Sequence, residues 1–503
     1  MPTIIAKEII MTKSKELDVK VKFGLKSFIT VVAILVAVLI VVGVLTFVIP
    51  AGRYTIYTTD ESKMGQLFYE YTTDESLNKQ IVIDSYRELT EEENASRLPI
   101  WRWLLSPFEA LIFGSSSGNM IMIIALLLVL GGTFKVLEES GGLVSLVRVI
   151  MVKLHSKRFA AIWVITAVIM ILSAVFGLQE QLLILYPVFA MLCTALNWSR
   201  FTAISFVLIA SGVGFTTAIT NPLTIGTASI AAGVSVTDGM WYRCIIFCVM
   251  YVITSLFLAY LAKRDEKKAT EKFDVEGFVM VTEEEHIEDI KKAKMIVALF
   301  SIALLSVIIT TAIDSLRSLA MVFMAVAFIV GTVIIGKKLL GTYKHLGKSF
   351  VKGVKDVLPS IVIIMIAFGI THIAQQGNIL HTIFHYFYNS VTNISPYLAV
   401  LILYVFVLII EFFIPSASAK AVLIIPMLTL APIEGISKTV IILTYLFADG
   451  YTNVLYPTCG TLLVGLGLAD VSFAEWFKKT ILFQLILFVL SLGFLMLAVF
   501  IGL

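Results

Sequence analysis

Two short polar runs interrupt apolar sequence and carry side chains that could bind a small charged molecule. Gln179–Gln181 places a carboxylate between two amides, and Pro415–Lys420 combines a proline, two serines and a lysine. An ionised side chain at the bilayer centre costs about 2.5–3.5 kcal/mol on insertion scales, so one found there usually has a function. Unwound backbone survives at that depth only where protein or a water-filled cavity surrounds it. Both runs therefore predict broken, re-entrant segments that line a polar cavity.

A second pair of breaks, Thr216–Thr227 and Asp449–Thr461, also places hydroxyl, amide and proline residues inside apolar sequence. The free N–H groups of half-helices suit a carboxylate, whereas Glu180 and Asp449 suit a cationic group, a proton or sodium. We expect all four breaks to meet near the membrane midplane. The candidate substrate-binding residues are Gln179, Glu180, Gln181, Thr217, Asn221, Thr224, Ser416, Ser418, Lys420, Asp449, Asn453 and Thr458.

Each candidate also has a purely structural explanation. Serine and proline occur in kinked membrane helices, where serine bonds to its own backbone. Lys420 could pair with Asp449 or with a substrate carboxylate, or could lie at the inner rim of the membrane. Glu180 is the strongest candidate because a lone carboxylate in apolar sequence is usually functional, and Glu411 is a weaker one. Four amide and hydroxyl residues could serve only as caps of broken helices, namely Asn221, Thr224, Asn453 and Thr458.

The sequence predicts no metal site and no cofactor. His381 and His385 are one helical turn apart, but they lie in an aromatic segment without a carboxylate partner. His372 ends an apolar span and is expected to face water, together with Gln375 and Gln376. The four cysteines lie in or beside apolar spans and fit core thiols. We expect no enzyme, since the sequence offers no nucleophile–base pair or metal cluster at membrane depth.

Composition places the chain in the membrane. Hydrophobic residues make up 59% of the chain and charged residues only 15%, which is typical of a protein with many membrane spans. The net charge of +3 does not indicate nucleic-acid binding. Lysines cluster before the apolar run Phe28–Pro50, which is long enough to span. We therefore expect an uncleaved first helix, with the N-terminus in the cytoplasm, in the plasma (inner) membrane.

The placement of lysine and arginine, and the charged stretches, divide the chain into seven parts. These are a cytoplasmic N-terminal tail (1–27), a first transmembrane helix (28–50), an extracytoplasmic acidic segment (51–106), a first transport repeat (107–262), a cytoplasmic linker (263–294), a linking helix pair (295–343) and a second, inverted transport repeat (344–503).

The two transport repeats match at an offset of about 235–239 positions. Ser199-Arg200 corresponds to Ser437-Lys438, and Asn221-Pro222 corresponds to Tyr456-Pro457. Trp241 after a glycine turn corresponds in the same way to Trp476. Basic residues place the start of the first repeat outside and that of the second inside. The fold class expected is an all-α polytopic membrane protein of inverted repeats with re-entrant hairpins and discontinuous helices, a pattern typical of secondary transporters.

The broken spans within Gly177–Gly233 and Glu411–Trp476, and a first helix ending Phe47–Gly52, resemble YfcC-type members of the C4-dicarboxylate anaerobic carrier (DcuC) group of the ion transporter superfamily. The resemblance covers residue 28 to the C-terminus. It implies a secondary carrier with two re-entrant hairpins and a homodimer. Substrates in the group include C4-dicarboxylates and basic amino acids. The Ser-Asn-Thr signatures of the superfamily are matched only in part here, at Thr220–Thr224 and Pro415–Ser418, so coupling to H+ or Na+ stays open.

We therefore expect a secondary active transporter, embedded in the lipid bilayer, for a small amino acid or carboxylate. A basic amino acid antiporter of the arginine/ornithine type, working by alternating access, fits the acidic residues Glu180 and Asp449. A C4-dicarboxylate carrier coupled to H+ or Na+ is the alternative, in which Lys420 and the helix N-termini dominate. A membrane-embedded enzyme or a channel is an alternative of a different class.

Overall fold

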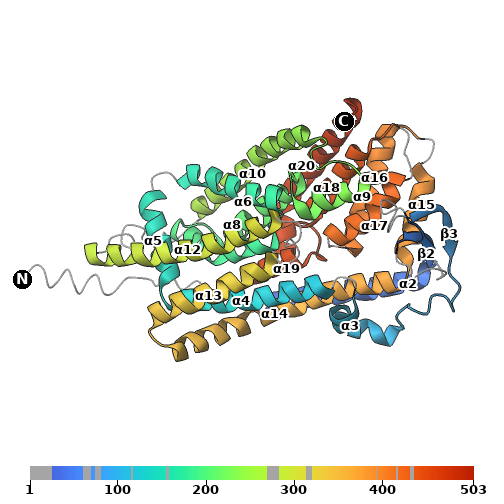
Figure 1. Ribbon diagram of the computed structural model, residues 1–503. Coiled ribbons are helices and arrows are strands. Elements are labelled where there is room, and N and C mark those ends of the chain that lie inside the picture. The colour runs from blue at the N-terminus through green and yellow to red at the C-terminus, as the bar shows by residue number, and fades with distance from the viewer. Residues whose placement is uncertain are drawn as a thin grey trace, which may run out of the picture.

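The computed structural model describes residues 25–59, 69–73, 81–114, 117–154, 158–268, 282–312, 320–391, 394–414, 417–430 and 435–503. These ranges form an elongated helical bundle with a small β-sheet at one end (Figure 1). Eight helical stretches in the described part of the chain are long and apolar enough to cross a membrane, and Val32–Val48 within α2 (Leu25–Val48) is a shorter apolar stretch. The predicted all-α polytopic membrane architecture is confirmed, with the sheet as an addition.

Two copies of one order of elements build the bundle. The first copy contains α3 (Ser106–Phe113), α4 (Ser117–Glu139), α5 (Gly142–Leu154), α6 (Arg158–Phe176), η5 (Glu180–Leu185), α7 (Tyr186–Ala195), α8 (Arg200–Thr217), η6 (Pro222–Gly226), α9 (Thr227–Ala232) and α10 (Met240–Lys268). The helices α12 (Glu283–Ala312) and α13 (Ala320–Leu340) connect the copies. The second copy contains α14 (Tyr343–Gln376), α15 (Ile379–Val391), α16 (Pro396–Phe413), α17 (Ala417–Leu430), α18 (Lys438–Thr452), α19 (Gly460–Leu468) and α20 (Phe473–Phe500).

Local capping shows the repeat directly. Ser199 and Ser437, 238 positions apart (437 minus 199), each accept a hydrogen bond from the backbone N–H three residues on and so cap α8 and α18. The equivalent helices α5 and α15 lie at opposite ends of the bundle (Figure 1). The copies are therefore inverted relative to each other, as predicted.

One predicted correspondence is wrong. Trp241 is the second residue of α10 and is 59% exposed, whereas Trp476 is the fourth residue of α20 and is 1% exposed. The difference arises because the turn before α10 contains more residues than the turn before α20. The left-handed residue Gly233 precedes Met240, while the left-handed residue Asp470 precedes Phe473. The residue of α10 equivalent to Trp476 is thus the fourth, Arg243.

The helix α14 combines a basic amphipathic stretch and an apolar stretch in one element. The stretch Lys344–Lys355 leads without a break through Pro359 into the apolar part, which ends at Gln376. Glycine lets α14 approach α4 closely, since a Cβ on Gly131 would lie 2.7 Å from the carbonyl oxygen of Gly353. Backbone-to-backbone contact therefore fixes this pair of helices.

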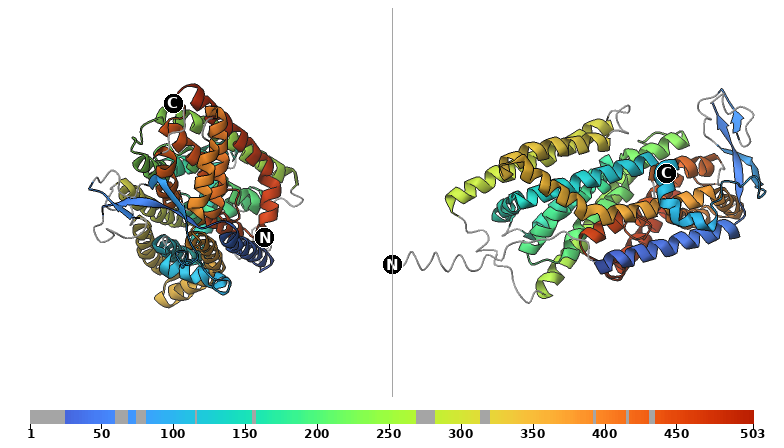
Figure 2. Two further views of the ribbon diagram at one scale, coloured as in Figure 1. Left: turned by 90° about the vertical axis from the view of Figure 1, so that its right-hand side faces the viewer. Right: turned by 90° about the horizontal axis from the view of Figure 1, so that it is seen from below.

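The sheet consists of β1 (Gly52–Thr58), β2 (Tyr69–Tyr71) and β3 (Ile81–Glu88), with β1 in the centre, parallel to β2 and antiparallel to β3. It projects beyond one end of the bundle (Figure 2, right). The ring of Tyr86 stacks on His385 of α15 at 3.9 Å, and Thr382 donates a hydrogen bond to the Pro50 carbonyl at 2.7 Å. His381 accepts a hydrogen bond from the backbone N–H of Tyr54 at 3.3 Å. The two histidines of this segment thus attach the sheet to α15.

The glycine contact between α4 and α14 leads to a stability prediction. Gly353→Leu should lower the free energy of unfolding by about 1–3 kcal/mol, because the added side chain must push the two backbones apart. Thermal unfolding in detergent measures the change. Gly347→Leu on the same helix is the matched control, since a Cβ there meets nothing within 4 Å. Equal melting temperatures for the two variants would contradict the packing argument.

Candidate functional site

The predicted breaks are present in the structure. In the first copy, α6 ends at Phe176 before the short helix η5, and α8 ends at Thr217, where Ala218 adopts a left-handed backbone with φ 38°. In the second copy, α16 ends at Phe413 before α17, and α18 ends at Thr452 before α19. Pro415 and Ser416 of the second break lie outside the described residues. Helix ends therefore converge at the positions that the polar runs marked.

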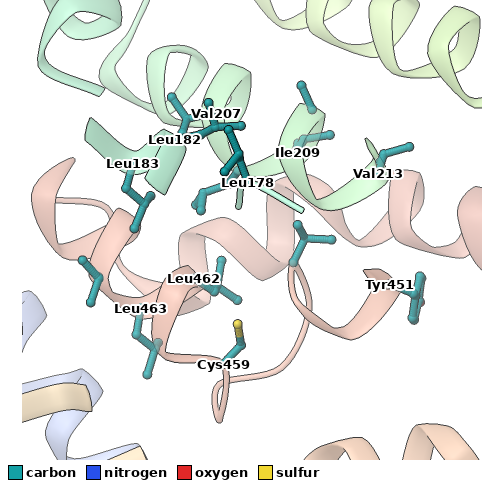
Figure 3. Packing of buried hydrophobic residues seen from close by; sticks show 14 of the residues in the cluster. Leu178, Leu182, Leu183, Val207, Ile209, Val213, Tyr451, Cys459, Leu462 and Leu463 are labelled. Carbon is teal, nitrogen blue, oxygen red and sulfur yellow. The ribbon is translucent and has the colours of Figure 1, made fainter. Parts of the chain in front are cut away.

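Direct contacts join breaks from the two copies. The side-chain amide of Asn453 donates a hydrogen bond to Gln179 Oε1 at 3.0 Å, and the thiol of Cys459 donates one to Asn453 Oδ1 at 3.6 Å. Leu178, next to Gln179 in the chain, and Leu462 belong with Cys459 to the same buried hydrophobic cluster (Figure 3). A polar connection between distant parts of the chain is thus enclosed by hydrophobic packing.

An ion-pair cluster lies at the second copy's breaks. The Lys420 ammonium is 2.7 Å from Asp449 Oδ1 and also pairs with Glu411, and all three side chains are at most 1% exposed. The ring of Tyr445 lies beneath the same ammonium at 5.5 Å, and its hydroxyl donates to the Ala417 carbonyl. Lys420 is therefore buried between α16, α17 and α18, and its predicted pairing with Asp449 is confirmed. This burial does not fit the alternative in which the ammonium reaches water at the inner rim.

The described part of the first copy has no equivalent of this cluster. Ser173 and Ser211 stand 238 positions before Glu411 and Asp449 (411 minus 173, 449 minus 211), and the Ser173 hydroxyl donates to the Ser211 carbonyl at 2.6 Å. The first copy contributes instead the half-buried Glu180, which is close enough to Asp449 for the two carboxylates to interact electrostatically. Two carboxylates thus pair with the Lys420 ammonium, and a third interacts with one of them.

Among the remaining candidates, some polar atoms bond within the protein and others are buried without a partner. Thr217 donates to its own helix at Gly214, and Asn221 Oδ1 accepts from the Leu223 N–H as a cap. Within the described ranges, however, Asn221 Nδ2, Thr224 Oγ1 and Thr458 Oγ1 are buried without a hydrogen-bond partner. Buried polar atoms normally have a partner, so these three are available to a ligand or to water. The side chains of Gln181 and Ser418 lie outside the described part.

Two residues differ from their expected positions. Glu411, ranked as a weaker candidate, is a full member of the ion-pair cluster. The sequence feature that could have identified Glu411 is its position near the end of an apolar run, a few residues before the break that carries Lys420. His372 was expected to face water, but it is 4% exposed and lies 3.8 Å from Glu109. It is covered because α3 packs across the end of α14, which hydropathy alone does not reveal.

Comparison with known proteins gives the family. The family model described as C4-dicarboxylate anaerobic carrier (DcuC) matches residues 28–500. The chain belongs to this family. It is a membrane transporter, as the resemblance implied.

Named relatives of the chain are distant in sequence but match over most of their length. The chain is 24% identical to the "putative basic amino acid antiporter YfcC" of Escherichia coli K12, over 90% of this chain and 93% of YfcC. It is 23% identical to an uncharacterized protein of Haemophilus influenzae Rd, over 88% and 92% of the two chains.

Two solved transporter structures are also similar. The YdaH transporter of Alcanivorax borkumensis has a TM-score of 0.42 at 16% identity, with 95% of this chain and 98% of YdaH covered. MtrF of Neisseria gonorrhoeae has a TM-score of 0.45 at 14% identity, with 93% and 95% covered.

The ion-pair cluster makes a prediction about stability. Lys420→Met should destabilise the protein by about 3–5 kcal/mol, because it leaves two carboxylates buried without their counter-ion. Adding Glu411→Gln and Asp449→Asn should recover most of that stability while transport stays absent. Chemical unfolding in detergent and uptake in proteoliposomes measure the two effects.

The matched control for this series is Ser211→Ala, at the position equivalent to Asp449. Its hydroxyl bonds only to its own helix among the described contacts, so the change should cost no more than about 1 kcal/mol. If Lys420→Met were no more destabilising than Ser211→Ala, the ion pairs would not hold α16, α17 and α18 together.

Proposed function

We propose that the protein is a secondary active antiporter of basic amino acids, of the arginine/ornithine type, that works by alternating access. The observation that carries the proposal is the excess of carboxylates at the breaks. Glu411 and Asp449 both pair with the Lys420 ammonium, and Glu180 lies close enough to Asp449 to interact with it electrostatically, so three carboxylates accompany one ammonium in this described cluster. A buried excess of negative charge favours a cationic ligand over an anionic one.

In this mechanism Lys420 serves as an internal counter-ion in the absence of substrate. Its ammonium joins Glu411 of α16 to Asp449 of α18, and so holds three helices in one arrangement. A guanidinium or ammonium of the substrate competes for the same carboxylates and releases that clamp. The substrate's carboxylate and amino groups meet the unpaired polar atoms of Asn221, Thr224 and Thr458. Reorientation is then fast only with substrate bound, which is the condition for exchange.

A second candidate is a C4-dicarboxylate carrier coupled to H+ or Na+, which the family's name favours. In that case the Lys420 ammonium would turn from its own carboxylates to those of the substrate. The Glu411 and Asp449 side chains would then need a proton or sodium to balance their charge. A dependence of uptake on a proton or sodium gradient distinguishes this carrier from an exchanger.

A single counterflow assay in proteoliposomes tests both proposed functions. Vesicles are loaded with unlabelled arginine, ornithine, malate or succinate, and labelled arginine or succinate is added outside. The antiporter takes up labelled arginine when loaded with ornithine or arginine and needs no ion gradient. Uptake of labelled succinate in vesicles loaded with malate would reject the basic amino acid proposal in favour of the dicarboxylate carrier.

The role of the first copy in substrate binding can be tested at one carboxylate, Glu180. Glu180→Gln should abolish arginine counterflow, with a loss of at least about tenfold, because it removes a charge that the substrate cation needs. The variant should still insert and remain folded, as judged by gel filtration in detergent. Glu92→Gln, at an exposed position near the sheet, is the matched control and should transport normally. Wild-type rates for Glu180→Gln would remove this residue from the site.

The proposed setting is the plasma membrane, with the N-terminus in the cytoplasm and the sheet outside. In a background without the native cysteines, Glu92→Cys should react with an impermeant maleimide in intact cells. Glu284→Cys, at the start of α12 and at the other end of the bundle (Figure 1), should react only after permeabilisation. The reverse labelling pattern would invert the orientation. The native cysteines to be replaced are Cys193, Cys244, Cys248 and Cys459.

A further inference from the structure

A buried arginine binds the unwound stretch after α8, which also bonds to the Ala174 carbonyl through the N–H groups of Thr220 and Asn221. Arg243, the fourth residue of α10, is 2% exposed. Its guanidinium donates to the carbonyl of Ile219 at 3.3 Å, to that of Asp238 at 2.8 Å, and to that of Val236. Ile219 lies between the end of α8 and the cap residue Asn221. One side chain thus ties the broken helix to the turn that begins α10.

The unwound stretch after α18 is bound by side chains of α20, the helix equivalent to α10. Trp476, the fourth residue of α20, is 1% exposed and donates its indole N–H to the carbonyl of Val454 at 2.9 Å. Gln484, two turns further along α20, donates to the same carbonyl at 3.2 Å. Val454 directly follows Asn453, whose amide reaches Gln179 in the other copy.

The two arrangements are related by the internal repeat. Ile219 and Val454 lie 235 positions apart (454 minus 219), and each is bound by the fourth residue of the last helix in its copy. The chemistry differs, a guanidinium in one copy and an indole with an amide in the other. The same backbone requirement is therefore met twice by different side chains.

Physical chemistry explains why a donor is needed at these places. Where a helix ends, its last carbonyls lose the N–H partners of the next turn. An unsatisfied backbone group at membrane depth costs several kcal/mol. A donor on the neighbouring helix removes that cost only when the unwound backbone lies in one position, so the donor also fixes the segment in that position. Without the donor, the segment would adopt other positions as well.

We propose that Arg243 and Trp476 are positioning residues that fix the two unwound segments, and through them Asn221 and Asn453, in the geometry that binds substrate. Neither side chain needs to touch the substrate. This inference rests on the proposed function only in taking the breaks as the substrate site. The positions of the segments themselves can be measured without any substrate.

The test uses Cys459 as a reporter, because its thiol bonds to Asn453 and points into the packed interior (Figure 3). In a background that keeps only this cysteine, Trp476→Phe with Gln484→Leu leaves the Val454 carbonyl without either donor. The rate of Cys459 alkylation by a small membrane-permeant reagent should rise by at least about tenfold, because the Val454 carbonyl loses both of its side-chain hydrogen bonds. The KM for arginine should rise by a similar factor, with little change in the maximal rate.

Matched variants separate positioning from general damage. Trp241→Phe, at the exposed tryptophan of α10, should change neither the alkylation rate nor KM. Arg243→Met should raise KM, and Arg243→Lys should restore part of the loss because an ammonium can still reach one carbonyl. If the double variant fails to fold, Trp476→Phe and Gln484→Leu are measured singly, since each leaves one donor and should give an intermediate rate.

The outcomes are distinct. An unchanged Cys459 alkylation rate in the double variant, or in both single variants, would overturn the positioning role. A raised alkylation rate without any arginine counterflow in the unmutated protein would uphold the positioning role and reject the proposed substrate. A raised rate together with a raised KM would support both.

Discussion

The structure depends on one electrostatic constraint, the burial of the Lys420 ammonium between two carboxylates. A charge in a medium of low dielectric constant is tolerated only when a counter-ion and hydrogen bonds replace its water. Glu411 and Asp449 supply that replacement from the helices on either side of α17. The same three helices therefore cannot separate without exposing or re-pairing these charges. Under the proposed function a cationic group of the substrate takes the place of Lys420, and the stability of the bundle and the binding of substrate are then parts of one equilibrium.

The internal repeat explains where this constraint is placed. Both copies provide a broken helix, a capped scaffold helix and a donor from the last helix of the copy. Only the second copy has the ion pairs, and the first has the hydroxyl contact between Ser173 and Ser211 in their place. Inverted repeats need to conserve backbone geometry, because that geometry gives two related conformations of similar energy. They do not need to conserve the side chains that hold it.

Sequence reasoning recovered the features that depend on local rules. Polar residues within apolar runs located the breaks, and the spacing of Ser199 and Ser437 located the equivalent caps. It failed where long-range packing decides. His372 is buried because α3 crosses α14, and the sequence between them contains no sign of that contact. Trp241 and Trp476 looked equivalent because a shared residue type hid a difference in turn length. The sheet on α15 was not predicted, since its strands pair across polar sequence within the acidic segment 51–106.

The difference between the copies also indicates which part of the molecule can rearrange. In the first copy α6 and α8 are in backbone contact, since a Cβ on Gly214 would lie 2.6 Å from the Met170 carbonyl oxygen. Two helices in such contact have no second relative position of similar energy, because closely packed backbones cannot slide without losing their packing. In the second copy a similar glycine contact holds α18 against α8, since a Cβ on Gly450 would lie 2.4 Å from the Thr216 backbone. The helix α17 contains no glycine and is joined to α16 and α18 by the ion pairs of Lys420. A bistable element requires two arrangements of similar energy. If the proposed function holds, a cationic substrate replaces these ion pairs, and α17 is then the element that has a second arrangement.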